Sequence, residues 1–159
     1  MRGRRSSPHR NCFDEQSALE RLADWSHPKS GGKSLIYTSY FAKLKTLPEG
    51  VIPISICGKA PAGYKGLQFK ELAPKYDFFM KWKVDHDNEH YIKCFNEQVL
   101  NTLDCEATVK RLLAMAGNFK GVNYLPSVCL VCYEKPGDFC HRHLVAEWLN
   151  QNGFECKEW

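Results

Sequence analysis

Apolar positions follow two different spacings from residue 34 onwards. Short apolar runs predict four strands, the last at a sheet edge, over residues 34–38, 51–56, 127–133 and 154–158. Between the second and third runs, Ile92, Phe95, Val99 and Leu103 recur at the spacing of a helix face. The chain therefore predicts strands that are separated by helices.

Start and stop signals predict further helices over residues 39–47, 72–82, 104–117 and 139–150. Asp104 is the expected N-cap of its helix, and Gly117 marks the expected end. Pro53 lacks the N–H that a central strand donates, so its strand is expected at a sheet edge or with a bulge. The loop at 58–66 is rich in glycine, proline and lysine and is a candidate flap over a ligand.

This order of elements predicts an α/β fold, with one compact domain and an open, mostly parallel sheet of about four to five strands. Helices are expected on both faces of the sheet. The α/β domain should occupy residues 34–159. Residues 1–33 are expected to hold a basic disordered tail, a helix and a connector, because the first twelve residues contain four arginines and few apolar side chains.

Composition narrows the class of protein. A chain of 159 residues with 43% hydrophobic residues is long enough for one domain with its own core. The net charge of +4 is compatible with an anionic ligand but does not by itself indicate nucleic-acid binding. The first residues contain no apolar leader and no run is long enough to span a bilayer, so we expect a cytoplasmic protein with no membrane partner, whose eight cysteines stay reduced.

The most reactive side chains gather at one predicted strand–turn–helix junction. Two thiols, a carboxylate, an imidazole and a guanidinium fall there, on Cys132, Glu134, Cys140, His141 and Arg142. The turn at 136–138 separates the strand end from the helix start. Helix N-termini offer unpaired N–H groups and a partial positive charge, so this junction is the expected ligand site.

Helix phase assigns candidate roles at the junction. His141 lies in line with the inward apolar stripe of its helix, and Cys140 lies in the first turn, where a thiol pKa is expected to fall. Cys140 is therefore the candidate nucleophile, with His141 or Glu134 as its base. The alternative is structural, with a buried inert cysteine and a hydrogen-bonded core histidine. Arg142 is expected either to clamp an anion or to pair with Glu134.

Zinc binding is an alternative chemistry for the same residues. Cys129 and Cys132 point to opposite faces of a strand, and His143 does not share a helix face with His141. One metal ion could still take Cys132, Cys140 and His141. We predict no cofactor, and a zinc or thiol-redox site stays open as an alternative.

The junction also resembles a known family. Cys132-Tyr-Glu134, a short turn, and then Cys140-His141-Arg142 before an apolar helix resemble the signature of the domain of unknown function family 488 (DUF488). The Tyr-Thr pair that ends at Thr38 is similar to the family's first strand, and the resemblance covers residues 34–158. The chain differs from many members in having Ser55-Ile-Cys57 in place of an Asp-x-Arg after the second strand.

The resemblance implies a compact α/β fold from bacteria or their viruses, without a settled activity. The positions carried over from the family motif are Thr38, Cys132, Glu134, Cys140, His141 and Arg142.

From these observations we expect an anionic ligand, a nucleotide or a nucleic-acid end, at the carboxyl ends of the first three strands. Cys140, His141 and Glu134 are the expected catalytic residues. The expected ligand-binding residues are Thr38, Ser39, Lys59, Cys132 and Arg142. The alternative function is a non-catalytic module that binds nucleic acid or acts as an adaptor.

Overall fold

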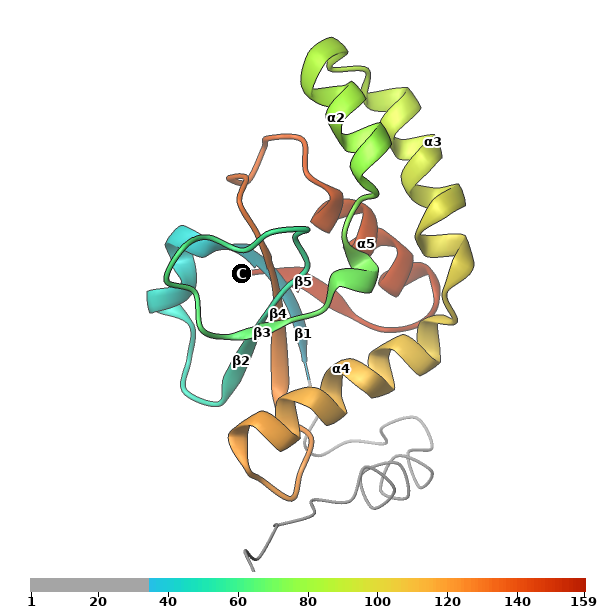
Figure 1. Cartoon of the computed structure of the whole chain (residues 1–159). Helices are drawn as coiled ribbons and strands as arrows, with labels where there is room; N and C mark the ends of the chain where they lie inside the picture. The colour runs from blue at the N-terminus through green and yellow to red at the C-terminus, as the bar shows by residue number, and fades with distance from the viewer. Residues whose placement is uncertain (1–34) are drawn as a thin grey trace, which may run out of the picture.

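The computed structural model describes residues 35–159 as a five-stranded sheet with helices packed against it (Figure 1). The strand order is β3-β2-β4-β1-β5, and every neighbouring pair is parallel. The predicted α/β class, the single compact domain and the parallel sheet are thus confirmed. The tail, helix and connector predicted for residues 1–33 lie outside the described residues.

The strands are short and are formed by β1 (Ile36–Tyr40), β2 (Val51–Ser55), β3 (Leu67–Gln68), β4 (Ser127–Cys132) and β5 (Cys156–Glu158). The α-helices are α2 (Tyr76–Asp85), α3 (Asn88–Gln98), α4 (Cys105–Lys120) and α5 (His141–Gln151). Short 3-10 helices occur at η1 (Phe41–Thr46), η2 (Lys70–Leu72) and η3 (Leu100–Thr102). Among residues 35–159, no helix combines the length and apolar character needed to cross a membrane.

Helices α4 and α5 cover one face of the sheet. Alternate residues of β4 point to opposite faces, so Val128 and Leu130 pack into the core beneath these helices, where Val109, Leu112 and Val145 are fully buried. η1 lies on the other face (Figure 1), where it is tied to the chain end by a hydrogen bond from the Trp159 indole to Thr46.

Of the two predicted ends of α4, the structure confirms the start and corrects the end. The Asp104 carboxylate accepts a hydrogen bond from the Ala107 N–H, as expected of an N-cap. The predicted end at Gly117 is wrong, because α4 continues to Lys120 and ends at Gly121, whose φ is 70°. A Cβ at Gly117 would lie 3.3 Å from the Tyr124 carbonyl oxygen, so this glycine allows close packing of the following loop.

The prediction that Pro53 places its strand at an edge or in a bulge is wrong, since β2 lies between β3 and β4 and pairs with β4 in unbroken register from Val51 to Ser55. The physical reason is the length of β3, a strand that the apolar pattern did not predict. β3 pairs only with Ile54 and Ser55, so no β3 residue needs an N–H from Pro53. The Pro53 carbonyl instead accepts a hydrogen bond from the Tyr64 hydroxyl.

The chain leaves the carboxyl ends of β2 and β4 in opposite directions. β2 is followed by the connection to β3 at one side of the sheet, whereas β4 is followed by α5 and then by β5 at the other side. Divergent connections of this kind open a crevice between two parallel strands, which is the usual ligand position in open α/β sheets.

Candidate functional site

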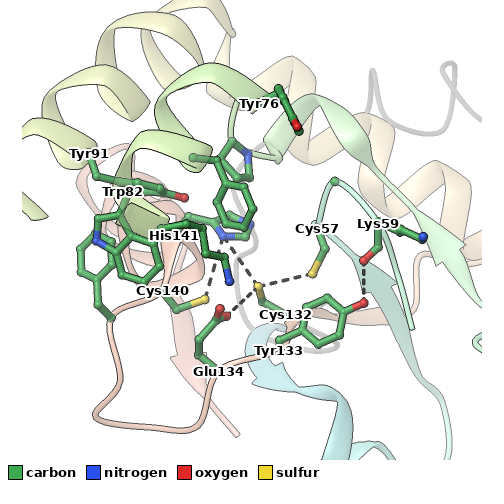
Figure 2. Close-up of a pocket in the computed structure, with 15 residues that line it drawn as sticks. Cys57, Lys59, Tyr76, Trp82, Tyr91, Cys132, Tyr133, Glu134, Cys140 and His141 are labelled. Carbon is green, nitrogen blue, oxygen red and sulfur yellow. Dashed lines mark hydrogen bonds between the residues drawn. The ribbon is translucent and has the colours of Figure 1, made fainter. Parts of the chain in front are cut away.

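A cavity of about 740 Å³ lies at the carboxyl ends of β2 and β4. Its walls come from the segments after these two strands, from the start of α5 and from α2 and α3, as Figure 2 shows. The lining residues are Cys57, Gly58, Lys59, Pro74, Tyr76, Phe79, Trp82, Lys83, Tyr91, Cys132, Tyr133, Glu134, Phe139, Cys140 and His141. The cavity thus occupies the crevice that the divergent connections of β2 and β4 open.

Three soft donor atoms converge on one side of this cavity (Figure 2). Cys132 ends β4, Cys140 is the N-cap residue of α5, and His141 is the first residue of that helix. The His141 Nδ1 atom lies 3.7 Å from the Cys132 sulfur and 4.0 Å from the Cys140 sulfur. All three residues are buried, and their donor atoms lie within 4.8 Å of one another, so they could hold a metal ion.

The ring of His141 is held in one orientation. Its Nε2 atom lies 2.8 Å from the Ile56 carbonyl oxygen, which can only accept a hydrogen bond. Nε2 must therefore carry a proton, and in the neutral ring Nδ1 presents its lone pair to the two sulfurs. The Phe95 ring packs against the imidazole, with centroids 5.6 Å apart.

Glu134 extends the cluster toward the cavity. The Cys132 thiol lies 3.1 Å from the Glu134 Oε2 atom and donates to it. Burial opposes ionisation of this carboxyl group, but hydrogen bonds from the Cys132 and Cys140 thiols lower its pKa below the ordinary value. Glu134 is thus a carboxylate at neutral pH.

The prediction of a lowered pKa for Cys140 is wrong. The neighbouring Cys132 sulfur and burial raise the pKa of the Cys140 thiol above its ordinary value, and the His141 ring only partly offsets them. At Cys132, the contact with Cys140 lowers the pKa of the thiol. The contact with Cys57 and burial raise it by more, so the pKa of Cys132 also lies above its ordinary value. The thiol–thiol contacts and burial therefore keep both thiols protonated at neutral pH.

Cys57 is a further thiol at the site. It follows β2, and its sulfur lies 3.3 Å from the Cys132 sulfur. All seven cysteines among residues 35–159 are free. The Ser55-Ile-Cys57 segment at the end of β2 thus places a thiol beside the cluster.

Aromatic rings form the opposite wall of the cavity. Trp82 of α2 and Tyr91 of α3 both contact Phe139, with centroid distances of 5.3 and 5.0 Å. Tyr76, at the start of α2, is 73% exposed while it lines the cavity. An aromatic wall with one exposed ring suits a flat ring system in the ligand.

Two lysines add positive charge to the lining. Lys59 follows β2 and Lys83 lies on α2, and both side chains are exposed. α5 begins at the cavity, and no side chain caps its first N–H groups. In the cavity lining, the two lysine charges outnumber the single carboxylate charge of Glu134.

Thr38 and Arg142 are brought together away from the cavity. Arg142 is fully buried, and its Nη2 atom donates to the Glu158 Oε1 atom over 2.9 Å. It also donates to the Glu134 carbonyl oxygen, so its contact with Glu134 is to the backbone and not to the carboxylate. The Thr38 hydroxyl donates to Glu158 over 2.6 Å. Neither residue lines the cavity.

Ser39 is also absent from the cavity lining. Its side chain is completely buried on the opposite face of β1 from Thr38, and its hydroxyl is the one buried side-chain N or O atom without a partner among residues 35–159. Of the predicted site residues, the structure therefore gathers Lys59, Cys132, Glu134, Cys140 and His141, and leaves out Thr38, Ser39 and Arg142.

The predicted flap is fastened at both ends. The Tyr133 hydroxyl donates to the Lys59 carbonyl over 2.7 Å, and the Tyr64 hydroxyl donates to the Leu67 carbonyl over 2.9 Å. Gly58 and Lys59 are the members of this loop that line the cavity.

Sequence reasoning missed most of the cavity wall. The missed residues are Cys57, Pro74, Tyr76, Phe79, Trp82, Lys83, Tyr91 and Tyr133. The one local signal was the density of aromatic residues in α2, where Tyr76, Phe78, Phe79 and Trp82 fall within seven positions. Four large rings are more than one helix face needs for packing.

Comparison with known proteins agrees with the C-terminal motif. The family model for the active DUF488-N3 subclade (DUF488-N3a) matches residues 41–153, a segment that contains every residue of the cavity lining. Its description names no reaction. No curated protein and no solved structure matched the chain. The chain therefore belongs to the DUF488 family.

Proposed function

We propose that this protein binds a nucleotide-class anion in the cavity between β2 and β4 and acts on it with the side chains on the inner side of that cavity. The observation that carries the proposal is the meeting of three features: an aromatic wall, two lysines, and a buried set of thiol, imidazole and carboxylate groups. Each feature matches a different part of such a ligand.

The ring system of the ligand would lie against the aromatic wall, where stacking on one ring contributes about 1–3 kcal/mol. The phosphate would lie near Lys59, Lys83 and the N-terminus of α5. This leaves the rest of the ligand beside Cys140, His141 and Glu134, the residues that we propose take part in the reaction.

Binding by this route uses protein side chains alone and needs no cofactor, so it is separable from any metal that the cluster holds. The free thiols of residues 35–159 support a reducing compartment, and we propose the cytoplasm.

Calorimetric titration of the full chain with a panel of ribonucleoside monophosphates tests the proposal. We expect saturable binding, weakened about tenfold, or about 1.4 kcal/mol, in the Lys59→Ala/Lys83→Ala double variant. Lys93→Ala is the matched control, because Lys93 is exposed on α3 and does not line the cavity.

A second pair of variants tests the aromatic wall. Tyr76→Ala should weaken binding, whereas Tyr124→Ala, which removes an exposed ring elsewhere, should not. Equal affinities for the wild-type chain and for both cavity variants would refute the proposed site. A ligand bound only as the end of an oligonucleotide would shift the substrate class from nucleotides to nucleic-acid ends.

A further inference from the structure

The convergence of Cys132, Cys140 and His141 is tighter than packing of apolar side chains requires. The three residues come from two elements, the end of β4 and the start of α5, which the turn at 133–139 brings together. The His141 Nδ1 atom faces both sulfurs (Figure 2).

We propose that Cys132 and Cys140, as thiolates, and His141, through Nδ1, bind one zinc-class divalent cation, with a fourth coordination position open to the cavity. Binding releases the two thiol protons to solvent. This inference goes beyond the proposed function. It does not depend on the nucleotide, because the metal content is measured on the protein without a nucleotide.

The spacing of the donor atoms fits such an ion. Tetrahedral zinc, with bonds of about 2.3 Å to sulfur and about 2.0 Å to nitrogen, separates neighbouring ligand atoms by about 3.5–3.8 Å. The His141 Nδ1 atom lies 3.7 Å from one sulfur and 4.0 Å from the other. All three donor atoms lie within 4.8 Å of one another, so side-chain shifts of no more than about 1 Å would bring them to this spacing.

The surroundings of His141 match those of a metal ligand. Metal-binding histidines usually donate their second ring N–H to a carbonyl or carboxylate, which fixes the ring and directs the other nitrogen at the ion. The Ile56 carbonyl accepts this hydrogen bond from Nε2 at 2.8 Å. Nδ1 is then the atom free to coordinate.

The described residues offer three ligands and not four. Among residues 35–159, the group of donor atoms that all lie within 4.8 Å of one another consists of Cys132, Cys140 and His141. Cys57 contacts Cys132 but falls outside the group, and Glu134 lies beside it without belonging to it. Three protein ligands beside a cavity are typical of zinc sites that keep a position for water or substrate.

The chemical class of the site follows from this arrangement. An open zinc position polarises a ligand oxygen or lowers the pKa of a bound water molecule. The Glu134 carboxylate lies next to that position and would accept a hydrogen bond from the water.

The test is the zinc content of the full chain, expressed with zinc and purified under reducing conditions. We expect about one equivalent in the wild-type chain and in Cys129→Ser, and less than about a tenth of an equivalent in Cys132→Ser and Cys140→Ser. Cys129 is a matched control because it is equally buried and lies on the opposite face of β4.

Cys57→Ser tests whether Cys57 is a fourth ligand. Retention of zinc in this variant supports the open site, whereas loss of zinc would overturn it in favour of a closed site with four protein ligands.

A measurement on the wild-type chain tests the zinc site even where the cysteine variants fail to fold. After exchange of zinc for cobalt, we expect thiolate-to-cobalt charge-transfer bands in the absorption spectrum. We also expect the bound metal to protect Cys132 and Cys140 from alkylation, which peptide mass spectrometry maps. A reduced wild-type chain that takes up neither metal would overturn the proposal, as would full zinc content in both cysteine variants.

Discussion

At the scale of single residues, an ion pair between a buried guanidinium and a partly exposed carboxylate decides the role of Arg142. Arg142 is completely buried, whereas the side chain of its partner Glu158 is 33% exposed. Thr38 donates to the same carboxylate. These contacts join α5, β1 and β5, so the guanidinium fastens the last strand to the sheet.

Arg142→Ala should therefore lower the free energy of unfolding by about 3 kcal/mol, since it leaves the Glu134 carbonyl without this donor and the Glu158 carboxylate with the Thr38 hydroxyl but no guanidinium. Urea unfolding measures the change. Arg111→Ala is the control, because its ion pair with Glu71 is exposed and should contribute no more than about 1 kcal/mol. Equal losses in the two variants would contradict the structural role of Arg142.

Tyr64 provides a pH-dependent test at the same scale. Burial raises the pKa of its hydroxyl to about 12, above the ordinary value of 10.0. The folded state thus favours the neutral phenol, and this stabilisation is complete below the ordinary pKa and is lost as the pH rises toward 12.

Between pH values of about 9 and about 11, the wild-type chain should lose more unfolding free energy than Tyr64→Phe. Urea unfolding at both pH values measures the difference, and Tyr124→Phe, which alters an exposed tyrosine, should behave as the wild type. The same pH dependence in Tyr64→Phe and the wild type would show that Tyr64 titrates normally.

At the scale of elements, the loop at 58–66 is held in place by the side chain of Tyr64. A Cβ at Gly66 would overlap the Tyr64 hydroxyl, while a Cβ at Gly58 would meet nothing within 4 Å. Both glycines have φ values within the range of other residues, so the two positions differ in space and not in backbone strain.

Gly66→Ala should displace the Tyr64 hydroxyl from its two carbonyl acceptors and lower the free energy of unfolding by about 1–3 kcal/mol. Gly58→Ala should change it by less than about 0.5 kcal/mol. Thermal and urea unfolding of the pair provide the measurement. A Gly66→Ala chain as stable as Gly58→Ala would show that Tyr64 does not anchor the loop.

The elements also show what local sequence determines. The runs at 51–56 and 127–133 predicted β2 and β4 because each strand carries its own apolar pattern, and Asp104 predicted the start of α4 because a cap acts within one turn. β3 was missed since a strand of two residues carries no period. Gly117 was misread because its use in packing against Tyr124 is not visible locally.

At the scale of the whole molecule, the candidate site was predictable in part. The turn between β4 and α5 brings Cys132, Cys140 and His141 together within ten residues, so the motif located them. The partner of Arg142 lies in β5 and was not predictable, because it depends on the register of β5 beside β1. The aromatic wall depends on how α2 and α3 lie over the carboxyl edge of the sheet.

The central claim is that one cavity joins the aromatic wall, the lysines and the Cys132, Cys140 and His141 cluster into a ligand site. The most direct measurement is a crystal structure of the full chain with the nucleotide that binds most tightly in the titration. We predict a base against Trp82 or Tyr76 and a phosphate near Lys59 and Lys83. A nucleotide bound elsewhere on the chain, with this cavity empty, would contradict the account.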